Sequence, residues 1–367
     1  MLRQYHIRDY DFKLIVLVVA LTVIGIFAIG SAEESLQSRQ IAGFVFGFFL
    51  MVVLSLFDYS IILRFYWIMY LLNLVLLELV REQGVERGGA QRWLNIFGIQ
   101  FQPSETAKIL LLLFFAQLIL KHKDEMDSFK TIGLCVLLFI PPIALIYKQP
   151  DLSTSIMVVL LFCVILFIGG ISWKYIIMAI AVAVPAFIIL LTLILQPDQK
   201  IIDPYQQRRI LAHFYPEEYA NAEAYQQKNS VIAIGSGMLY GKGYKNNESS
   251  SVKNGNFISE PQTDFIFAVI GEEFGFVGGC TVIVLLILIS FECIMVARRA
   301  KDIAGTIIAA GVAALIGFQG IINISVATRV IPNTGIPLPF VSYGLTSLVS
   351  LYIGVGFVLN VRLQCKK

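Results

Sequence analysis

Asp264 stands where a catalytic base could work. It lies in the stretch EPQTDFIF (residues 260–267), between a long polar region and an almost charge-free apolar segment. A carboxylate at such a boundary between water and membrane is costly to ionise, so its pKa can rise toward that of a general base. The spacing leaves a second interpretation open, in which the side chain only caps the helix that follows.

A second charged cluster is GAQRWLNIFGIQFQPSETAK (residues 89–108), which includes Arg92 and Trp93. Pro103, Ser104 as the cap and Glu105 in the first turn predict the start of a helix. Glu105 and Lys108 are three residues apart and therefore share one helix face. They form either a structural ion pair or a pair that faces a substrate. Trp93 is equally well explained as an anchor at the membrane surface.

Two more polar clusters interrupt apolar segments. In KQPDLST (residues 148–154), Asp151 is expected to cap the next helix, and Lys148 could offset the charge of a phosphate. In TGIPLPFVSYG (residues 334–344), glycine and two prolines predict a broken backbone. Such backbone is tolerated at membrane depth only against protein or a water-filled cavity, so this cluster also indicates a site.

The composition places these clusters in a membrane protein. Of the 367 residues, 57% are hydrophobic and only 14% are charged, whereas soluble domains are nearer 45–50% and 25%. This excludes a soluble enzyme and a disordered chain. The formal net charge of +3 is small and dispersed, so we expect no nucleic-acid partner. The five cysteines form no CxxC motif and the three histidines are scattered, which disfavours a zinc site.

We expect an all-α polytopic membrane protein whose 367 residues form a single domain. About 20 apolar residues cross a bilayer as a helix. Ten such segments are predicted, and one large extracytoplasmic loop of about 196–262 separates the seventh from the eighth. The predicted spans lie near 14–32, 41–57, 61–80, 104–120, 131–147, 154–171, 175–195, 271–297, 303–328 and 340–361.

The orientation follows from lysine and arginine in the short loops. The side that holds both termini carries 14 of them and the opposite side 6, so both termini are predicted to be cytoplasmic. The first part of the long outer loop is expected to form short amphipathic helices on the membrane. AIGSGMLYGKGY (residues 233–244) lacks the spacing of a phosphate-binding P-loop and is interpreted as flexible turns, and NNESSSVKNGN (residues 246–256) as flexible.

These motifs, in this order between ten spans, resemble the SEDS family of shape, elongation, division and sporulation proteins, typified by RodA and FtsW. The most specific pieces are GAQRW…QPSETAK, KQPDLST, AIGSGMLYGKG, EPQTDFIFAVIGEEFGFVG and TGIPLPFVSYG. The sequence departs from the family's motifs at two positions, and both changes are mild. Ser153 replaces the glycine of KQPDLGT, and Leu345 follows Gly344 where the family continues with a second glycine.

The resemblance implies a peptidoglycan glycosyltransferase of the bacterial cytoplasmic membrane. Such proteins polymerise lipid II, an undecaprenyl-diphosphate-linked disaccharide-pentapeptide, into glycan strands outside that membrane, during elongation or division. They work beside a class B penicillin-binding protein and among membrane lipids. The family's essential aspartate matches Asp264. A divalent cation, Mg²⁺ or Mn²⁺, could share the work of stabilising the departing diphosphate.

A diphosphate leaving group needs positive charge around it, which Arg92, Lys108, Lys148 and either Arg208 or Arg209 could supply. Two other functions remain open from the sequence, a lipid II flippase and a non-catalytic scaffold for the penicillin-binding partner. Charges that gather near the outer face, not the midplane, disfavour the flippase. The candidate substrate-binding residues, taken from the polar clusters and the long loop described above, are Arg92, Trp93, Ser104, Glu105, Lys108, Lys148, Gln149, Asp151, Arg208, Arg209 and Ser342.

Overall fold

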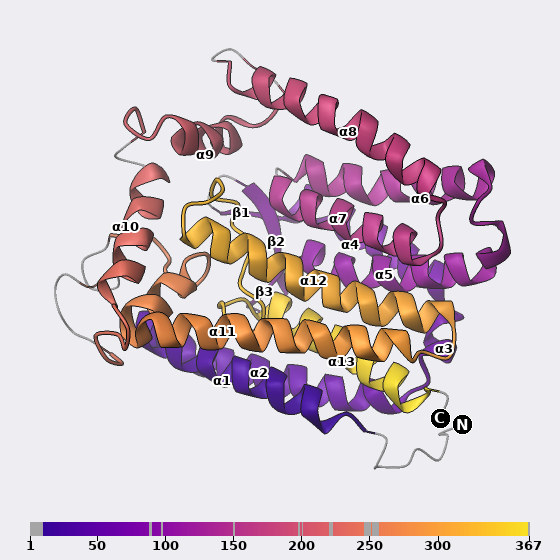
Figure 1. Ribbon diagram of the computed structural model, residues 1–367, viewed down its shortest axis with the longest axis horizontal. Coiled ribbons are helices and arrows are strands. Elements are labelled where there is room, and N and C mark those ends of the chain that lie inside the picture. The colour runs from indigo at the N-terminus through magenta and orange to yellow at the C-terminus, as the bar shows by residue number, and fades with distance from the viewer. Residues whose placement is uncertain are drawn as a thin grey trace.

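The structure is a computed structural model that describes residues 10–87, 90–96, 98–149, 151–196, 199, 201–219, 223–245, 251 and 257–365. Within these residues the chain forms thirteen α-helices, one 3-10 turn and three short strands (Figure 1). Most of the stretch predicted to be flexible, 246–256, lies outside the described residues.

A helix covers each of the ten predicted spans, so the chain is a multi-pass membrane protein, as predicted. Eight of these helices are long and apolar enough to cross a membrane; α7 is one residue short of the 18-residue length, and α4 carries three charged residues. The ten are α1 (Phe12–Ala32), α2 (Glu34–Leu56), α4 (Tyr66–Gln83), α5 (Pro103–Lys121), α6 (Phe129–Lys148), α7 (Leu152–Ile168), α8 (Trp173–Ile194), α11 (Ile266–Arg298), α12 (Ile303–Ala327) and α13 (Leu345–Leu363).

The core of the bundle is formed by α5, α12 and α13. Helix α13 packs against α2, α12 and α5, and α12 packs against α11, α5 and α7. Helix α8 is the least packed, because none of its most apolar 18 residues is buried, and Figure 1 shows it beside the bundle, not inside it. Several predicted boundaries shift by five residues or more, among them the starts of α2 and α11. The third span splits into α3 (Tyr59–Leu63) and α4, and the last begins at Leu345 because residues 339–343 form turns and bends after the irregular segment 332–338.

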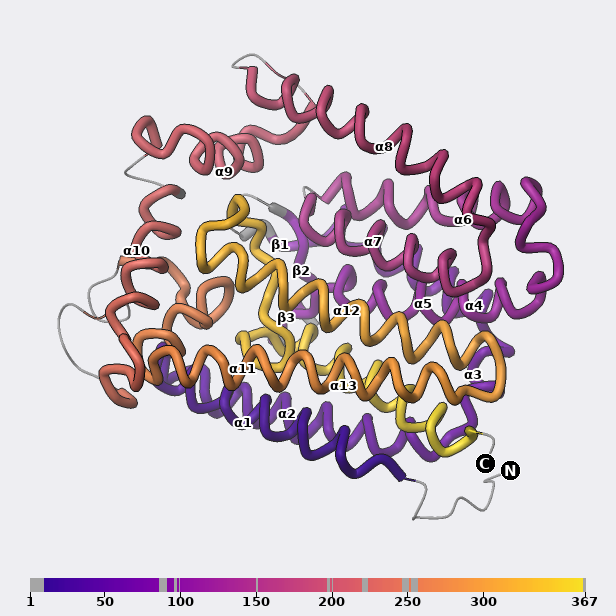
Figure 2. Tube along the Cα trace, in the orientation of Figure 1, coloured from indigo at the N-terminus to yellow at the C-terminus, as the bar shows by residue number. Residues whose placement is uncertain are grey.

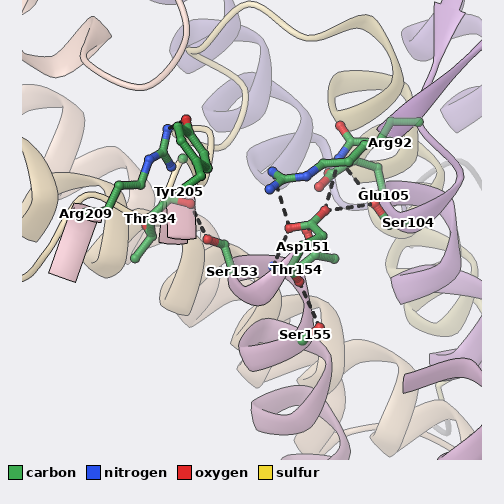
Figure 3. A network of polar contacts seen from close by, with 12 residues as sticks. Arg92, Ser104, Glu105, Asp151, Ser153, Thr154, Ser155, Tyr205, Arg209 and Thr334 are labelled. Carbon is green, nitrogen blue, oxygen red and sulfur yellow. Dashed lines mark hydrogen bonds and ion pairs between the residues drawn. The ribbon is translucent and has the colours of Figure 1, made fainter. Parts of the chain in front are cut away.

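A small antiparallel sheet between α4 and α5 was not predicted. Its strands β1 (Val85–Arg87), β2 (Ala90–Ile96) and β3 (Ile99–Phe101) pair in the order β1-β2-β3. The sequence did carry a turn signal, since Gly98 adopts a φ of 81° between β2 and β3. The sheet carries Arg92 over the first turns of α5 and α7 (Figure 3).

The long polar region between α8 and α11 contains short helices, as the sequence led us to expect: α9 (Pro204–Phe214) and α10 (Glu223–Ser236). Figure 2 shows both at the end of the bundle where α11 begins, and the opposite end holds the start of α1 and the end of α13. The candidate residues therefore gather at the end that α9 and α10 cover.

Helix α11 is broken at Gly275, whose φ of 63° and ψ of −160° are not helical. The break leaves backbone groups without partners inside the helix, and the loop after α10 supplies them. Lys242 and Gly243 donate their backbone N–H groups to the carbonyls of Glu272 and Glu273, at 2.9 and 3.1 Å. In return, two amides after the break donate to Met238 and Leu239.

This docking corrects the prediction of flexible turns in residues 233–244. Because two backbones meet here, glycine is required where a side chain would collide with the partner chain. A Cβ atom on Gly241 (φ 81°) would overlap the carbonyl oxygen of Glu273, whereas one on Gly243 (φ 97°) would meet open space. The loop thus fixes the first half of α11, immediately after Asp264.

We therefore expect Gly241→Ala to destabilise the protein far more than Gly243→Ala. Both substitutions place alanine at a positive φ, which costs about 1–3 kcal/mol, but only Gly241→Ala adds a collision with backbone. Thermal unfolding in detergent measures the difference. Equal melting temperatures for the two variants would show that the loop is not tightly docked.

Candidate active site

A small polar cavity of about 30 Å³ lies where β2, the first turns of α5 and α7, helix α12 and residues 335–337 meet. This volume has room for one or two water molecules. The polar side chains lining it include Arg92, Glu105, Lys108, Asp151 and Gln319. Four of these five were predicted from sequence, and the structure brings them together from three separate elements.

Asp151 is the best-satisfied carboxylate of this cavity. It caps α7, as predicted, by accepting the backbone N–H of Thr154 at 3.1 Å, and it accepts the Thr154 hydroxyl at 2.9 Å. Arg92 lies 3.6 Å from the same carboxylate, and the Ser104 hydroxyl donates to it at 3.5 Å. Asp151 is only 1% exposed, so its main effect is to hold Arg92 over the cavity (Figure 3).

Glu105 and Lys108 form the predicted ion pair, with 2.7 Å between Oε1 and Nζ. Both side chains are almost fully buried, at 4% and 3% exposure. The predicted cap was wrong, because α5 begins after Gln102 with Pro103 in its first turn, and Ser104 lies inside the helix. Ser104 is the second residue of the helix, and its hydroxyl donates to the Asp151 carboxylate instead.

Asp264 does not cap α11. The cap residue is Phe265, whose side chain has no hydrogen-bonding atom, so the structure removes the alternative that the sequence left open. The backbone around Asp264 is held firmly. Asn323 of α12 donates to the Asp264 carbonyl at 2.9 Å and to the Ile336 carbonyl at 2.8 Å. One buried amide thus ties the aspartate segment to the irregular segment 332–338.

Ser342 ties the same two segments together from the other side. Its hydroxyl donates to the Thr263 carbonyl at 2.6 Å and accepts the backbone N–H of Leu338 at 2.8 Å. Tyr343 adds a backbone bond to Gln262 at 2.9 Å. Ser342 is therefore placed to position the Asp264 segment.

Gly335 is the point where the charges meet. At its φ of 73°, a Cβ atom would lie 3.1 Å from Nη1 of Arg209 and 3.4 Å from Oδ2 of Asp264. The guanidinium and the carboxylate therefore face each other over a residue that has no side chain. Burial raises the pKa of Asp264, the Arg209 charge lowers it, Glu260 raises it and Arg92 lowers it.

Arg209 reaches this point from α9. Tyr205, one turn earlier, hydrogen-bonds the guanidinium through its hydroxyl and lies under it, with 4.6 Å from the Arg209 Cζ to the ring centroid. Figure 3 shows Tyr205 and Arg209 together on one side of Ser153, and Arg92 with Asp151 on the other. Between the two groups, the Ser153 hydroxyl donates to the Thr334 carbonyl.

Four predicted residues neither line the cavity nor take part in the contacts around Asp264. Lys148 and Arg208 are exposed, and Trp93 is half-buried in β2, where it pairs with Val85. Gln149 is buried against α4 and donates to the Leu77 carbonyl at 2.8 Å. Their roles in substrate binding remain predictions.

Gln319 and Asn323 of α12 were not predicted, because ionisable residues are the stronger signal of a site within apolar helices. Gln319 is 1% exposed, and neither of its amide atoms has a hydrogen-bond partner within the described part of the chain. An amide is costly inside an apolar helix unless a neighbour, water or ligand satisfies it. The stretch GFQGIINIS, with two amides in an otherwise apolar segment, was the available signal.

Comparison with known proteins identifies the family to which this chain belongs. The sequence profile described as "Cell cycle protein", covering FtsW, RodA and SpoVE, matches residues 9–367. The chain is 34% identical to peptidoglycan glycosyltransferase MrdB of Escherichia coli, over 97% of this chain and 94% of that protein. It is 32% identical to stage V sporulation protein E of Bacillus subtilis, over 78% and 75%.

Solved structures agree. A chain of a peptidoglycan synthase complex, solved in work on the coordination of polymerization and crosslinking, has a TM-score of 0.79 at 28% identity and covers 96% of this chain. The match covers 97% of that chain. The rod shape determining protein RodA of Thermus thermophilus has a TM-score of 0.70 at 27% identity, over 96% of both chains. This chain belongs to the FtsW/RodA/SpoVE family, as the sequence motifs indicated.

The burial of the Glu105–Lys108 pair generates a stability prediction. Glu105→Gln should cost about 3–5 kcal/mol, because it leaves the buried Lys108 ammonium without a counter-ion. The double variant Glu105→Gln/Lys108→Met should recover much of that loss, as a double-mutant cycle by thermal unfolding would show. The exposed pair Glu78–Arg81 has the same spacing and serves as the control, where Glu78→Gln should cost under about 1 kcal/mol. Similar losses at both pairs would contradict the prediction.

Proposed function

We propose that this protein is a peptidoglycan glycosyltransferase that polymerises lipid II, with Asp264 as its general base. The observation that carries the proposal is the position of the Asp264 carboxylate. It is partly buried, does not cap a helix, and faces Arg209 across Gly335 beside a polar cavity. The relatives named peptidoglycan glycosyltransferase support the substrate class.

In the proposed reaction, a hydroxyl oxygen of one sugar attacks the anomeric carbon of another that is linked to a lipid diphosphate. The bond from that carbon to the diphosphate oxygen breaks, and the hydroxyl proton passes to the Asp264 carboxylate. Arg209 and Arg92 contribute the positive charge that the departing diphosphate requires. Burial raises the pKa of Asp264 and so strengthens its basicity, while the charges of Arg209 and Arg92 oppose that rise and favour the ionised form.

The flippase alternative is less well supported. The charged side chains of the cavity lie on β2, in the first two turns of α5 and at the start of α7, and Asp264 lies ahead of α11. All are at the end covered by α9 and α10. A transporter that alternates between two sides is expected to bind near the midplane. Chemistry on a substrate displayed at one membrane surface agrees better with this placement.

A divalent cation, Mg²⁺ or Mn²⁺, is proposed only together with the substrate. Within the described residues, no cluster of three or more histidine, cysteine, aspartate or glutamate side chains could hold a metal ion. Mg²⁺ commonly binds one or two carboxylates plus substrate phosphates, and Asp264 is the carboxylate best placed for that. Such an ion would supply charge neutralisation at the diphosphate.

We also propose that the α9–α10 end faces the outside of the bacterial cytoplasmic membrane and that both termini are cytoplasmic. The excess of lysine and arginine at the opposite end supports this orientation. The proposed partner is a class B penicillin-binding protein, which would crosslink the strands. The structural similarity to a chain from a complex that coordinates polymerization and crosslinking supports that pairing.

Asp264→Asn should abolish strand synthesis from lipid II by the purified protein with its partner. Loss of a positioned base costs about 10²–10⁴-fold in rate, and the amide cannot accept the proton. Electrophoresis of glycan strands measures the product. Glu218→Gln, which removes an exposed acid in the same outer region, should remain active. Strand synthesis near the wild-type rate by Asp264→Asn would rule out the assigned base.

Single cysteines test the orientation in whole cells. In a background without the five native cysteines, a membrane-impermeant maleimide should label Glu218→Cys beyond α9 and leave Asp124→Cys between α5 and α6 unlabelled. Both positions are exposed, so accessibility depends on the side of the membrane. The reverse labelling would place Asp264 in the cytoplasm and exclude strand synthesis outside the cell.

A further inference from the structure

A second recess lies at the end of the bundle away from Asp264, where α1 begins and α11 and α13 end. Its volume is about 540 Å³, within the range of about 300–1,000 Å³ typical of small-molecule sites. Aromatic and aliphatic side chains line it together with charged ones. The residues that matter here are Phe12, Lys13, Phe291, Met295, Arg299 and Arg362.

Two arginines give this recess an excess of positive charge. Lys13 and Glu292 are paired with each other, and Asp11 caps α1 by accepting the Leu14 backbone N–H. Arg299 follows α11 and Arg362 lies in the last turn of α13. Within the described part of the chain, no carboxylate lies within ion-pair distance of either guanidinium.

The walls continue from the recess into an apolar surface. Phe12 and Phe291 are each more than half exposed. Phe291 belongs to a stripe of exposed apolar residues along one face of α11, at helical spacing: Val284, Ile287, Leu288, Phe291 and Ile294. On α1, Val16 lies one turn beyond Phe12 and is also exposed. An occupant that fits has an anionic head between the arginines and hydrocarbon chains along this surface.

The chain's own N-terminal sequence does not fit that description. Residues 1–9 contain Arg3 and Arg8 against a single acidic residue, Asp9, so this segment repels the two arginines of the recess. An apolar helix of a partner would match the stripe on α11 but would leave both guanidiniums without an anion. A phospholipid with an anionic headgroup satisfies both parts of the surface.

We propose that this recess binds an anionic phospholipid, with its phosphate between Arg299 and Arg362 and its acyl chains along α1 and α11. Guanidinium groups bind phosphate oxygens through two parallel hydrogen bonds, and basic pockets between membrane helices recognise such headgroups. The site is separate from Asp264 and goes beyond the proposed glycosyltransferase function. It would anchor the ends of three helices of the bundle to one lipid.

Native mass spectrometry of the purified protein with added phosphatidylglycerol tests the proposal without any need for lipid II. The wild-type protein should retain phosphatidylglycerol in preference to phosphatidylethanolamine of the same acyl chains. Arg299→Gln and Arg362→Gln should each weaken retention about fivefold. Arg298→Gln is the matched control, because it removes a neighbouring exposed arginine outside the recess.

Two results would overturn the lipid site. One is equal retention by wild type, Arg299→Gln and Arg298→Gln, since Arg299 is exposed and its replacement should not disturb folding. The other is complete displacement of the lipid by an equal concentration of glycerol 3-phosphate, which would show that the apolar walls contribute nothing. A single peak in size-exclusion chromatography verifies that each variant is folded.

Discussion

Asp264 and Arg209 face each other above Gly335, and most of the surrounding structure serves to keep these two charges at the edge of an apolar bundle. A lone carboxylate there would be driven to its neutral form by burial, which raises its pKa. The arginine comes from α9, the aspartate precedes α11, and the glycine belongs to residues 332–338. Three elements distant in sequence must therefore be fixed relative to one another, and a side chain at position 335 would separate them.

Buried hydrogen bonds to the backbone, and not ion pairs, hold these elements in place. Asn323 and Ser342 each bridge the Asp264 segment and the irregular segment, which would otherwise leave unsatisfied carbonyls and amides at membrane depth. The loop 237–243 performs the same task for the break in α11 at Gly275. In the neighbouring cavity, Asp151 holds Arg92 by an ion pair. The Glu105–Lys108 pair and Gln319 line the same cavity, which has room for water.

Much of this arrangement could be predicted from the sequence. A helix covers each of the ten apolar segments, eight of them long and apolar enough to span, because bilayer thickness dictates helix length. The i,i+3 spacing predicted the Glu105–Lys108 pair. The β-sheet escaped prediction because its strands are short and only Gly98 marks a turn. The prediction that Ser104 caps α5 was wrong because its hydroxyl donates to Asp151 of another element. Gln319, Asn323 and Tyr205 were missed since their importance depends on which helices lie next to them.

The most direct measurement is the pH dependence of strand synthesis. If ionised Asp264 is the base, activity rises with pH as the carboxylate loses its proton. Arg209 lowers the pKa of Asp264, so Arg209→Gln should raise that pKa and move the acid limb of the profile to higher pH. Arg208→Gln, on the same helix but exposed, should leave the limb unmoved. An acid limb that Arg209→Gln does not shift, or that both variants shift equally, would contradict the account.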